Sequence, residues 1–239
     1  MPECIHGLEV PLCDACYPKA VVEKPKPART LTPRSARVAG VNTTKKSINL
    51  TQQRVYHVTH INNLESILDA GAILSEVTPQ VDLSTPLTRE LRQSAEVAPG
   101  RSVADNVPFF LVPNASLWDD LRGGAQDETR WSAAARASVA ADFVFLVTTV
   151  AALGDDAVVA DGDAAATFTR FAAGVDRGRM IERLHDTEAG LGAEVLAPGT
   201  VPFDAIQLIG VANDRVRDRV RDFTATKVAV YPPWFQPAE

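Results

Sequence analysis

A regular pattern of a strand followed by a helix begins with RVYHVTHINNLESILDAGAI, residues 54–73. Its first residues are rich in β-branched and aromatic side chains, which is typical of a strand. Because side chains alternate along a strand, His57 and Thr59 are expected on one face and His60 on the other. Two of the four histidines of the chain therefore stand near the end of one strand.

A helix is expected to follow this strand directly. Asn62 is a good N-cap residue, Glu65 stands three residues later as in a capping box, and Gly71 fits the position after the helix. The turn between strand and helix would then offer backbone N–H groups and Asn side chains to a polar or anionic ligand. The residues alone leave an alternative open, in which His57 is a buried histidine bound by a neighbour and the Asn residues only cap the helix.

The chain has 239 residues and a net charge of −6, which fits one main domain with an appendage. No apolar run reaches the length of a membrane span, and the N-terminus does not resemble a secretory signal, so a soluble, cytoplasmic protein without membrane contact is expected. Residues 1–55 hold nine Lys and Arg against four Asp and Glu. This basic segment could touch nucleic acid or serve as a solvated linker, whereas the acidic remainder excludes a general polyanion-binding surface.

All three cysteines lie close together at the start of the chain, with one histidine between them. Cys13 and Cys16 form a C-x-x-C pair, a spacing at which two thiolates can bind one tetrahedral Zn²⁺. Cys4 and His6 could complete the site. We therefore expect a small zinc knuckle over residues 1–18, folded around a structural metal ion. Two alternatives stay open, a tail with reduced thiols and a metal site that needs a second chain.

Residues 19–50 are rich in Pro, Lys, Arg, Ser and Thr and lack apolar periodicity, which predicts a flexible basic linker. The folded domain is expected to occupy residues 51–239. Its pattern mixes short helices and strands irregularly, so an α+β fold is predicted. Helices are expected at 84–97, 116–124, 163–174, 179–190 and 214–223, and strands at 106–113, 141–150, 192–199, 206–212 and 227–231.

Three segments occur in an order that resembles the DarT family of bacterial DNA ADP-ribosyltransferase toxins. They are YHVTHINNLESILDAGAI (56–73), VPFFLVP (107–113) and AEVLAPGTVPFDAIQLIGV (193–211), and the resemblance extends over residues 54–232. It implies an ADP-ribosyltransferase fold, a split pair of twisted, mostly antiparallel sheets with flanking helices and with NAD in the cleft. It also implies transfer of ADP-ribose from NAD to a base of single-stranded DNA, with release of nicotinamide. The partner that it implies is an antitoxin, expected as a macrodomain that removes the modification.

The same resemblance implies roles for the residues around the first strand. His57 and Thr59 match the family's NAD-binding strand. His60 and Asn63 lie where the following turn closes over the dinucleotide. These four residues are therefore expected to bind NAD.

Glu194 matches the catalytic glutamate of the family. A carboxylate that is hydrogen-bonded to a ribose hydroxyl can orient the sugar and stabilise the oxocarbenium-like centre that forms when the nicotinamide–ribose bond breaks. Arg92 is the best match to the family's site arginine, with Arg89 as its rival, and it could bind phosphate or assist at the base. Phe110, or its neighbour Phe109, could stack on nicotinamide or on the incoming base.

Two departures from the family pattern concern the acceptor rather than NAD. The loop at 113–116 reads Pro-Asn-Ala-Ser where familiar members have Pro-Arg-Ser-Pro, and the usual arginine doublet is reduced to single arginines. The loop at 184–192, which should recognise the target, carries Asp186 and Glu188, and these repel a phosphate backbone. Transfer to RNA or protein therefore stays open beside DNA, as does a non-catalytic module that binds NAD or nucleic acid.

Overall fold

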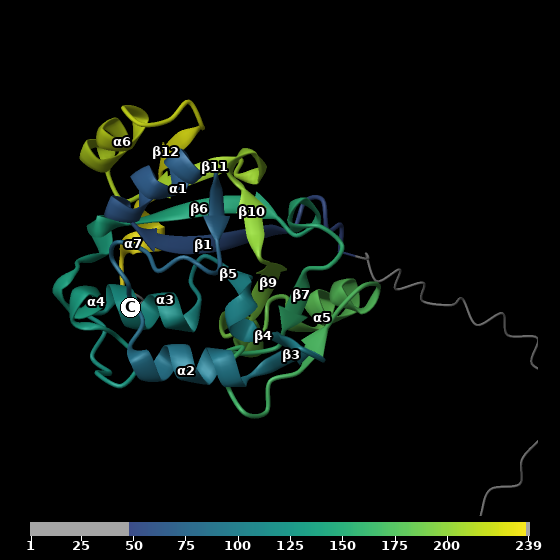
Figure 1. The fold of residues 1–239 in the computed structure, drawn as a ribbon. Helices are drawn as coiled ribbons and strands as arrows, with labels where there is room; N and C mark the ends of the chain where they lie inside the picture. Colours follow the sequence, from purple (N-terminus) through teal and green to yellow (C-terminus); the bar gives the residue numbers. More distant parts are fainter. Residues whose placement is uncertain (1–47, 238–239) are drawn as a thin grey trace, which may run out of the picture. The chain divides into compact units, whose positions relative to one another are not determined.

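The computed structural model describes residues 48–237 of the chain. The expected zinc knuckle at 1–18 and residues 19–47 of the expected linker lie outside the described residues. The described part confirms the α+β prediction, because an eight-stranded sheet is flanked by short helices (Figure 1). No helix among the described residues is long and apolar enough to cross a membrane.

The strands are β1 (Arg54–His60), β2 (Ala72–Leu74), β3 (Glu96–Ala98), β4 (Arg101–Ser102), β5 (Asn106–Phe110), β6 (Phe143–Thr149), β7 (Val158–Ala160), β8 (Phe171–Ala172), β9 (Glu194–Pro198), β10 (Thr200–Pro202), β11 (Leu208–Val211) and β12 (Val228–Val230). The large sheet has the order β12-β11-β6-β1-β5-β9-β7-β8 and is antiparallel except where β11 pairs with β12. Two small sheets accompany it, β2 with β10 and β3 with β4.

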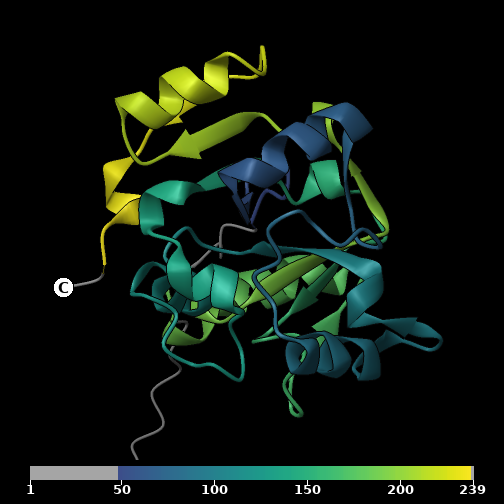
Figure 2. The ribbon, with the colours of Figure 1, turned by 60° about the vertical axis from the view of Figure 1, so that its left-hand side comes forward.

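The α-helices are α1 (Leu64–Ala70), α2 (Pro86–Ser94), α3 (Ser116–Arg122), α4 (Ala133–Ala137), α5 (Asp176–Leu184), α6 (Asp214–Arg221) and α7 (Pro232–Phe235). Capping residues mark where several of them begin. Thr85 and Asn213 accept backbone N–H groups at the starts of α2 and α6. In both views α6 lies beside the β11–β12 half of the sheet and α2 on the opposite side of the molecule (Figure 1, Figure 2).

The large sheet divides into two halves between β1 and β5. β1 pairs with β6 along its whole length, yet among the described residues it pairs with β5 only through Tyr56 and Phe110. Pro108 of β5 has no N–H to donate to a neighbouring strand. Its carbonyl instead accepts a hydrogen bond from the His57 side chain at 2.9 Å. The halves therefore diverge where His57 lies, as the resemblance to a split-sheet fold implies.

The core lies on both faces of β6, whose residues are all buried, in agreement with the buried strand predicted at 141–150. One cluster includes β1, β5 and β9 side chains, and the other surrounds the fully buried Trp118. Ile48 and Leu50 also pack against the first cluster, and the N–H of Ile48 donates to Glu182 at 3.0 Å. Contacts with the core thus begin upstream of residue 51.

The start of the first helix differs from the prediction. The N-cap after β1 is His60 rather than Asn62, because the His60 Nδ1 accepts the Asn62 N–H at 3.2 Å and a 3₁₀ turn precedes α1. The predicted end is confirmed. Gly71 follows α1 in the left-handed region, at a φ of 65°, which glycine adopts without strain.

The helix predicted at 163–174 is wrong, because this segment is a turn followed by β8. The Asp163 carboxylate accepts the Ala165 N–H at 3.0 Å, and the Asp163 carbonyl accepts the Thr169 hydroxyl at 2.6 Å. Such local side-chain bonds give the backbone an alternative to helical bonding. Phe171 then pairs with Ala160 of β7, so the end of the segment is part of the sheet and not of a helix.

Candidate active site

Glu194 is the first residue of β9, and it is buried within the sheet, with 1% of its surface exposed. One carboxylate oxygen, Oε1, accepts the backbone N–H of Ala164 at 3.1 Å. The other, Oε2, accepts both terminal nitrogens of Arg92 at 3.3 Å. Burial of a carboxylate is unfavourable unless it is bonded in this way, and charge-assisted bonds are the strong ones. These contacts hold the Glu194 side chain in one orientation.

The structure brings Arg92, rather than Arg89, to the carboxylate. Arg92 lies in the last turn of α2, and its guanidinium is mostly buried against Glu194. Arg89 forms an ion pair with Asp82 and lines a large cavity beside this helix. The two arginines that the sequence left as rivals therefore occupy different places.

His57 lies on β1 at the line where the sheet divides. Its Nδ1 is 2.9 Å from the Pro108 carbonyl, which can only accept, so Nδ1 carries the hydrogen and the Nε2 of the neutral ring is an acceptor. Desolvation by the surrounding protein lowers the pKa of His57, and the bond to Pro108 opposes this in part. The ring also packs against Phe109, with centroids 5.5 Å apart. His57 is thus a neutral, fixed group near neutral pH.

A cavity of about 530 Å³ is lined by α1, α2, the segment after β2 and the divided part of the sheet. This volume lies in the range of small-molecule and cofactor sites. Its wall combines apolar residues such as Ile67 and Ile73 with His57 and with two arginines, Arg89 and Arg92. Apolar surface beside fixed polar and cationic groups suits a ligand that carries flat rings and phosphates.

A second cavity, of about 110 Å³, shares His57 and Arg92 with the first. Its lining also includes Glu194 and Phe110. Phe109, by contrast, is buried in the core. Glu194 and the aromatic side chain of Phe110 therefore line the small cavity, which adjoins the large one through His57 and Arg92.

The other residues expected to bind NAD occupy different places. Thr59 and Asn63 line the large cavity, but the Asn63 amide is bonded to Thr59 Oγ1 and to both backbone groups of Val81. Asn63 thus fixes the segment around Val81, which forms one wall of the cavity. His60 instead caps the 3₁₀ turn and packs edge-on against Phe143.

The resemblance to the family pointed to the Glu194 and Arg92 side chains, but the sequence analysis missed the third group of the site, the backbone N–H of Ala164. A backbone group has no sequence signature of its own. The one available signal was Asp163, because this residue type favours turns that present backbone N–H groups. The Ala-rich segment that follows it outweighed that signal and led to the helix prediction.

Within residues 48–237, no cluster of His, Cys, Asp and Glu side chains is arranged to hold a metal ion. The expected zinc ligands Cys4, His6, Cys13 and Cys16 lie outside the described residues. A structural zinc ion at the start of the chain therefore stays a prediction.

Comparisons with known proteins point to one family. The family model described as "ssDNA thymidine ADP-ribosyltransferase, DarT" matches residues 56–236. A DNA ADP-ribosyl transferase of Mycobacterium tuberculosis is 29% identical over 195 residues, which cover 70% of this chain and 80% of that protein. Thermus sp. 2.9 DarT in complex with ADP-ribosylated ssDNA has a TM-score of 0.65 at 22% identity, over 77% of this chain and 96% of that one. The same protein in complex with NAD+ has a TM-score of 0.62 at 23% identity, over 77% and 98% of the two chains.

The likeness to the two Thermus structures establishes the fold. The family model covers most of the chain, including β5, β9 and nearly all of β1. His57, Pro108 and Glu194 all lie within the match. The chain therefore belongs to the DarT family of ssDNA thymidine ADP-ribosyltransferases.

Proposed function

We propose that this protein transfers ADP-ribose from NAD to a base of single-stranded DNA and releases nicotinamide. The observation that carries the proposal is the Glu194 carboxylate, which Arg92 and the Ala164 N–H hold beside two adjoining cavities. Membership of the DarT family supports the reaction type. The NAD+ and the ADP-ribosylated ssDNA named for the Thermus structures support the two substrates.

The large cavity is the proposed NAD site. Arg89 supplies positive charge for the pyrophosphate, whereas Arg92 is bound to Glu194. Thr59 and the Nε2 of His57 offer polar contacts. Asn63 acts indirectly in this proposal, because its amide is already bonded and holds the cavity wall in place. His60 has no role in NAD binding here, because its ring caps the turn after β1.

Catalysis rests on the placement of charge. The bond between ribose C1′ and the nicotinamide nitrogen breaks, and its electron pair neutralises the leaving ring. Glu194 accepts a hydrogen bond from a ribose hydroxyl and stabilises the positive charge that develops on the sugar. A ring nitrogen of the base then bonds to C1′ and loses its proton, for which Glu194 is a nearby acceptor. Arg92 keeps the carboxylate oriented, and Phe110 packs against the nicotinamide or the base.

The proposed acceptor is a thymidine, because the family description names this nucleoside. The loop that precedes β9 carries the exposed, acidic Asp186, paired with His185 at 2.7 Å, and Glu188. These carboxylates repel phosphate groups. We therefore expect the strand to approach this loop with its bases rather than with its backbone.

The remaining parts of the chain belong to the same proposal. In this proposal residues 1–18 bind zinc and residues 19–47 are the basic linker that helps to engage DNA. The catalytic domain begins at Ile48 rather than at residue 51, because Ile48 and Leu50 pack against the core. The reaction takes place in the cytoplasm, where NAD and DNA are both present. The partner is an antitoxin of the macrodomain type, which removes ADP-ribose from the base.

Intact-mass spectrometry of short oligonucleotides tests the proposal. Single-stranded DNA with and without thymidine, and matched RNA, are incubated with NAD and with wild-type protein, Glu194→Ala or the control Glu90→Ala, an exposed carboxylate on α2. We expect a gain of one ADP-ribose on thymidine DNA with wild type and Glu90→Ala, but not with Glu194→Ala. NAD consumption without a DNA adduct would indicate that the acceptor is RNA or protein and not DNA. No consumption would favour a non-catalytic binding module.

A further inference from the structure

We infer that Arg130 is a positioning residue for Glu194, because it links the two segments whose groups bind the carboxylate. The inference rests on the proposed function and adds a residue that does not itself touch the reacting atoms. Arg130 lies in the loop between α3 and α4. Its backbone contacts the start of α2, and its side chain contacts the turn that follows β7.

The backbone of Arg130 is attached to the N-terminal end of α2. Its carbonyl oxygen accepts the Thr88 hydroxyl at 2.9 Å and the Thr85 N–H at 3.3 Å. Thr85 is the N-cap of this helix and accepts the Thr88 N–H at 3.1 Å. The other end of α2 carries Arg92, which binds the Oε2 of the carboxylate. The loop therefore fixes where α2 begins and, through the rigid helix, where the Arg92 guanidinium lies.

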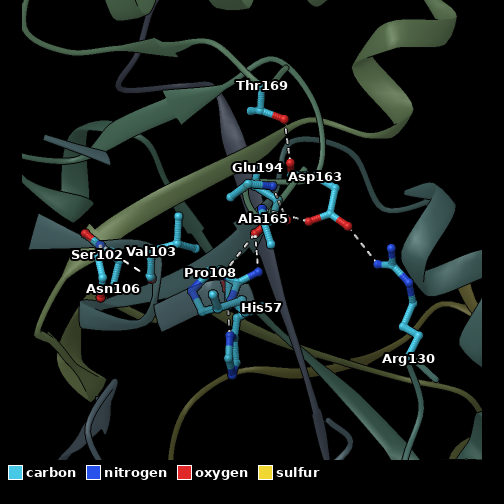
Figure 3. A network of polar contacts seen from close by, with 12 residues as sticks. His57, Ser102, Val103, Asn106, Pro108, Arg130, Asp163, Ala165, Thr169 and Glu194 are labelled. Carbon is cyan, nitrogen blue, oxygen red and sulfur yellow. Dashed lines mark hydrogen bonds and ion pairs between the residues drawn. The ribbon is translucent and has the colours of Figure 1, made fainter. Parts of the chain in front are cut away.

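The side chain of Arg130 is attached to the turn after β7. Its Nη1 donates to Asp163 Oδ2 at 2.7 Å. The second carboxylate oxygen of Asp163 accepts the Ala165 N–H at 3.0 Å, and the Asp163 carbonyl accepts the Thr169 hydroxyl at 2.6 Å. Between these anchors stands Ala164, whose N–H donates to the Oε1 of the carboxylate at 3.1 Å. Figure 3 shows Arg130 reaching Asp163, with Ala165, Thr169 and Glu194 on the other side of Asp163.

Arg130 thus fixes the relative positions of the two groups that donate to Glu194, Arg92 and the Ala164 N–H, although it comes from a third segment of the chain. Its side chain is 35% exposed and that of Asp163 is 23% exposed, so the ion pair adds little to the stability of the whole domain. The ion pair instead keeps Arg92 and the Ala164 N–H aligned with the Glu194 carboxylate. A misplacement of about 1 Å in a catalytic group can lower a rate by about 10²-fold, even when the domain stays folded.

Arg136 supplies a matched control, because its side chain is 36% exposed and pairs with the exposed Glu128 at 2.5 Å. We expect Arg130→Ala to lower kcat for ADP-ribose transfer about 10-fold, with the KM for NAD unchanged within about twofold. Arg130→Lys should restore most of the rate. The double variant Arg130→Ala/Asp163→Ala should be no slower than Asp163→Ala alone, because each of the two changes removes the same ion pair between Arg130 and Asp163. Arg136→Ala should change neither constant.

A readout that does not depend on catalysis is the exchange rate of the Ala164 amide hydrogen, followed by NMR spectroscopy. It should rise in Arg130→Ala and stay at the wild-type level in Arg136→Ala. Wild-type kcat together with wild-type exchange in Arg130→Ala would overturn the inference and leave the proposed function standing. If the wild-type protein transfers ADP-ribose to no acceptor, the proposed function fails instead. The Ala164 exchange then decides alone whether Arg130 orders the turn.

Discussion

The His57 imidazole donates from Nδ1 to the Pro108 carbonyl across the line where the sheet divides, at 2.9 Å. In the part of the chain that the structure describes, the two strands are joined as a ladder only at Tyr56 and Phe110, and Pro108 has no N–H to extend that ladder. The Nδ1–H of His57 thus forms the hydrogen bond between the two strands that a backbone N–H would otherwise form. The contact fixes the ring, and the lowered pKa of His57 keeps it neutral near neutral pH.

This arrangement predicts how stability depends on pH. Burial lowers the pKa of His57 in the folded protein, so below the ordinary value of about 6.5 the unfolded chain binds a proton that the folded chain does not bind. The stabilisation is complete above about pH 6.5 and is lost as the pH falls, by at most about 1.4 kcal/mol per pH unit for one group. Urea denaturation of wild type and His57→Asn between about pH 7.5 and 5 measures the effect.

We expect the wild-type protein to lose stability more steeply than His57→Asn on acidification. His60, whose pKa is also lowered by burial, is present in both proteins and cancels in the comparison. Equal slopes for the two proteins would mean that His57 titrates in the folded protein as it does in the unfolded chain.

Substitutions of the two arginines of α2 should change different kinetic constants. Arg92→Lys is expected to lower kcat about 10²-fold, because an ammonium group cannot present two nitrogens to Glu194 Oε2 as the guanidinium does. Arg89→Lys keeps a charge opposite Asp82 and should mainly raise the KM for NAD. Steady-state NAD consumption measures both constants. The opposite pattern would assign the catalytic arginine to Arg89.

Asn63 should matter for both folding and NAD affinity. Its buried amide bonds both backbone groups of Val81, so Asn63→Ala leaves these groups without partners and should destabilise the domain by about 2–3 kcal/mol. Because the same bonds hold the cavity wall, the KM for NAD should rise while kcat changes less. Thermal denaturation and NAD kinetics test this, with the exposed neighbour Asn62→Ala as control. If Asn63→Ala were less stable but had an unchanged KM for NAD, Asn63 would contribute to folding and not to NAD binding.

Gly210 should tolerate no side chain. A Cβ at this position of β11 would lie 2.6 Å from Trp234 Cζ3, so Gly210→Ala must displace α7 and should destabilise the domain by about 1–3 kcal/mol. Gly178→Ala is the control, because a Cβ there meets no atom within 4 Å and alanine favours the helix. Melting temperatures of both variants check the prediction, which a stable Gly210→Ala would contradict.

Removal of residues 1–47 should spare NAD turnover and weaken DNA binding. These residues hold eight Lys and Arg against four Asp and Glu, so their loss should also reduce the salt dependence of DNA affinity. The cut falls before Ile48, because this residue packs against the core and bonds Glu182. Titrations of labelled single-stranded DNA at several salt concentrations measure the effect. Unchanged affinity at every concentration would give the segment another purpose.

Local patterns predicted much of the fold, because the responsible forces act over short stretches. The buried β6 follows from its continuous apolar run, and the end of α1 follows from Gly71. The segment at 163–174 was predicted as a helix because alanine favours helices, but the bonds of Asp163 and the pairing of β8 with β7 prevail. The match to the family favoured Arg92 but left Arg89 as a rival, since only the packing of α2 decides which one reaches Glu194, 102 positions away.

β9 lies between β5 and β7, two strands that precede it in the chain. During synthesis it must therefore insert between partners that have already left the ribosome, and closing such long loops is a slow step. Until Glu194 is made and β9 is in place, neither Arg92 nor the Ala164 amide has a carboxylate to bind. The active site is thus among the last parts of the molecule to form, and a chain that ends before β9 lacks the carboxylate that the site is built around.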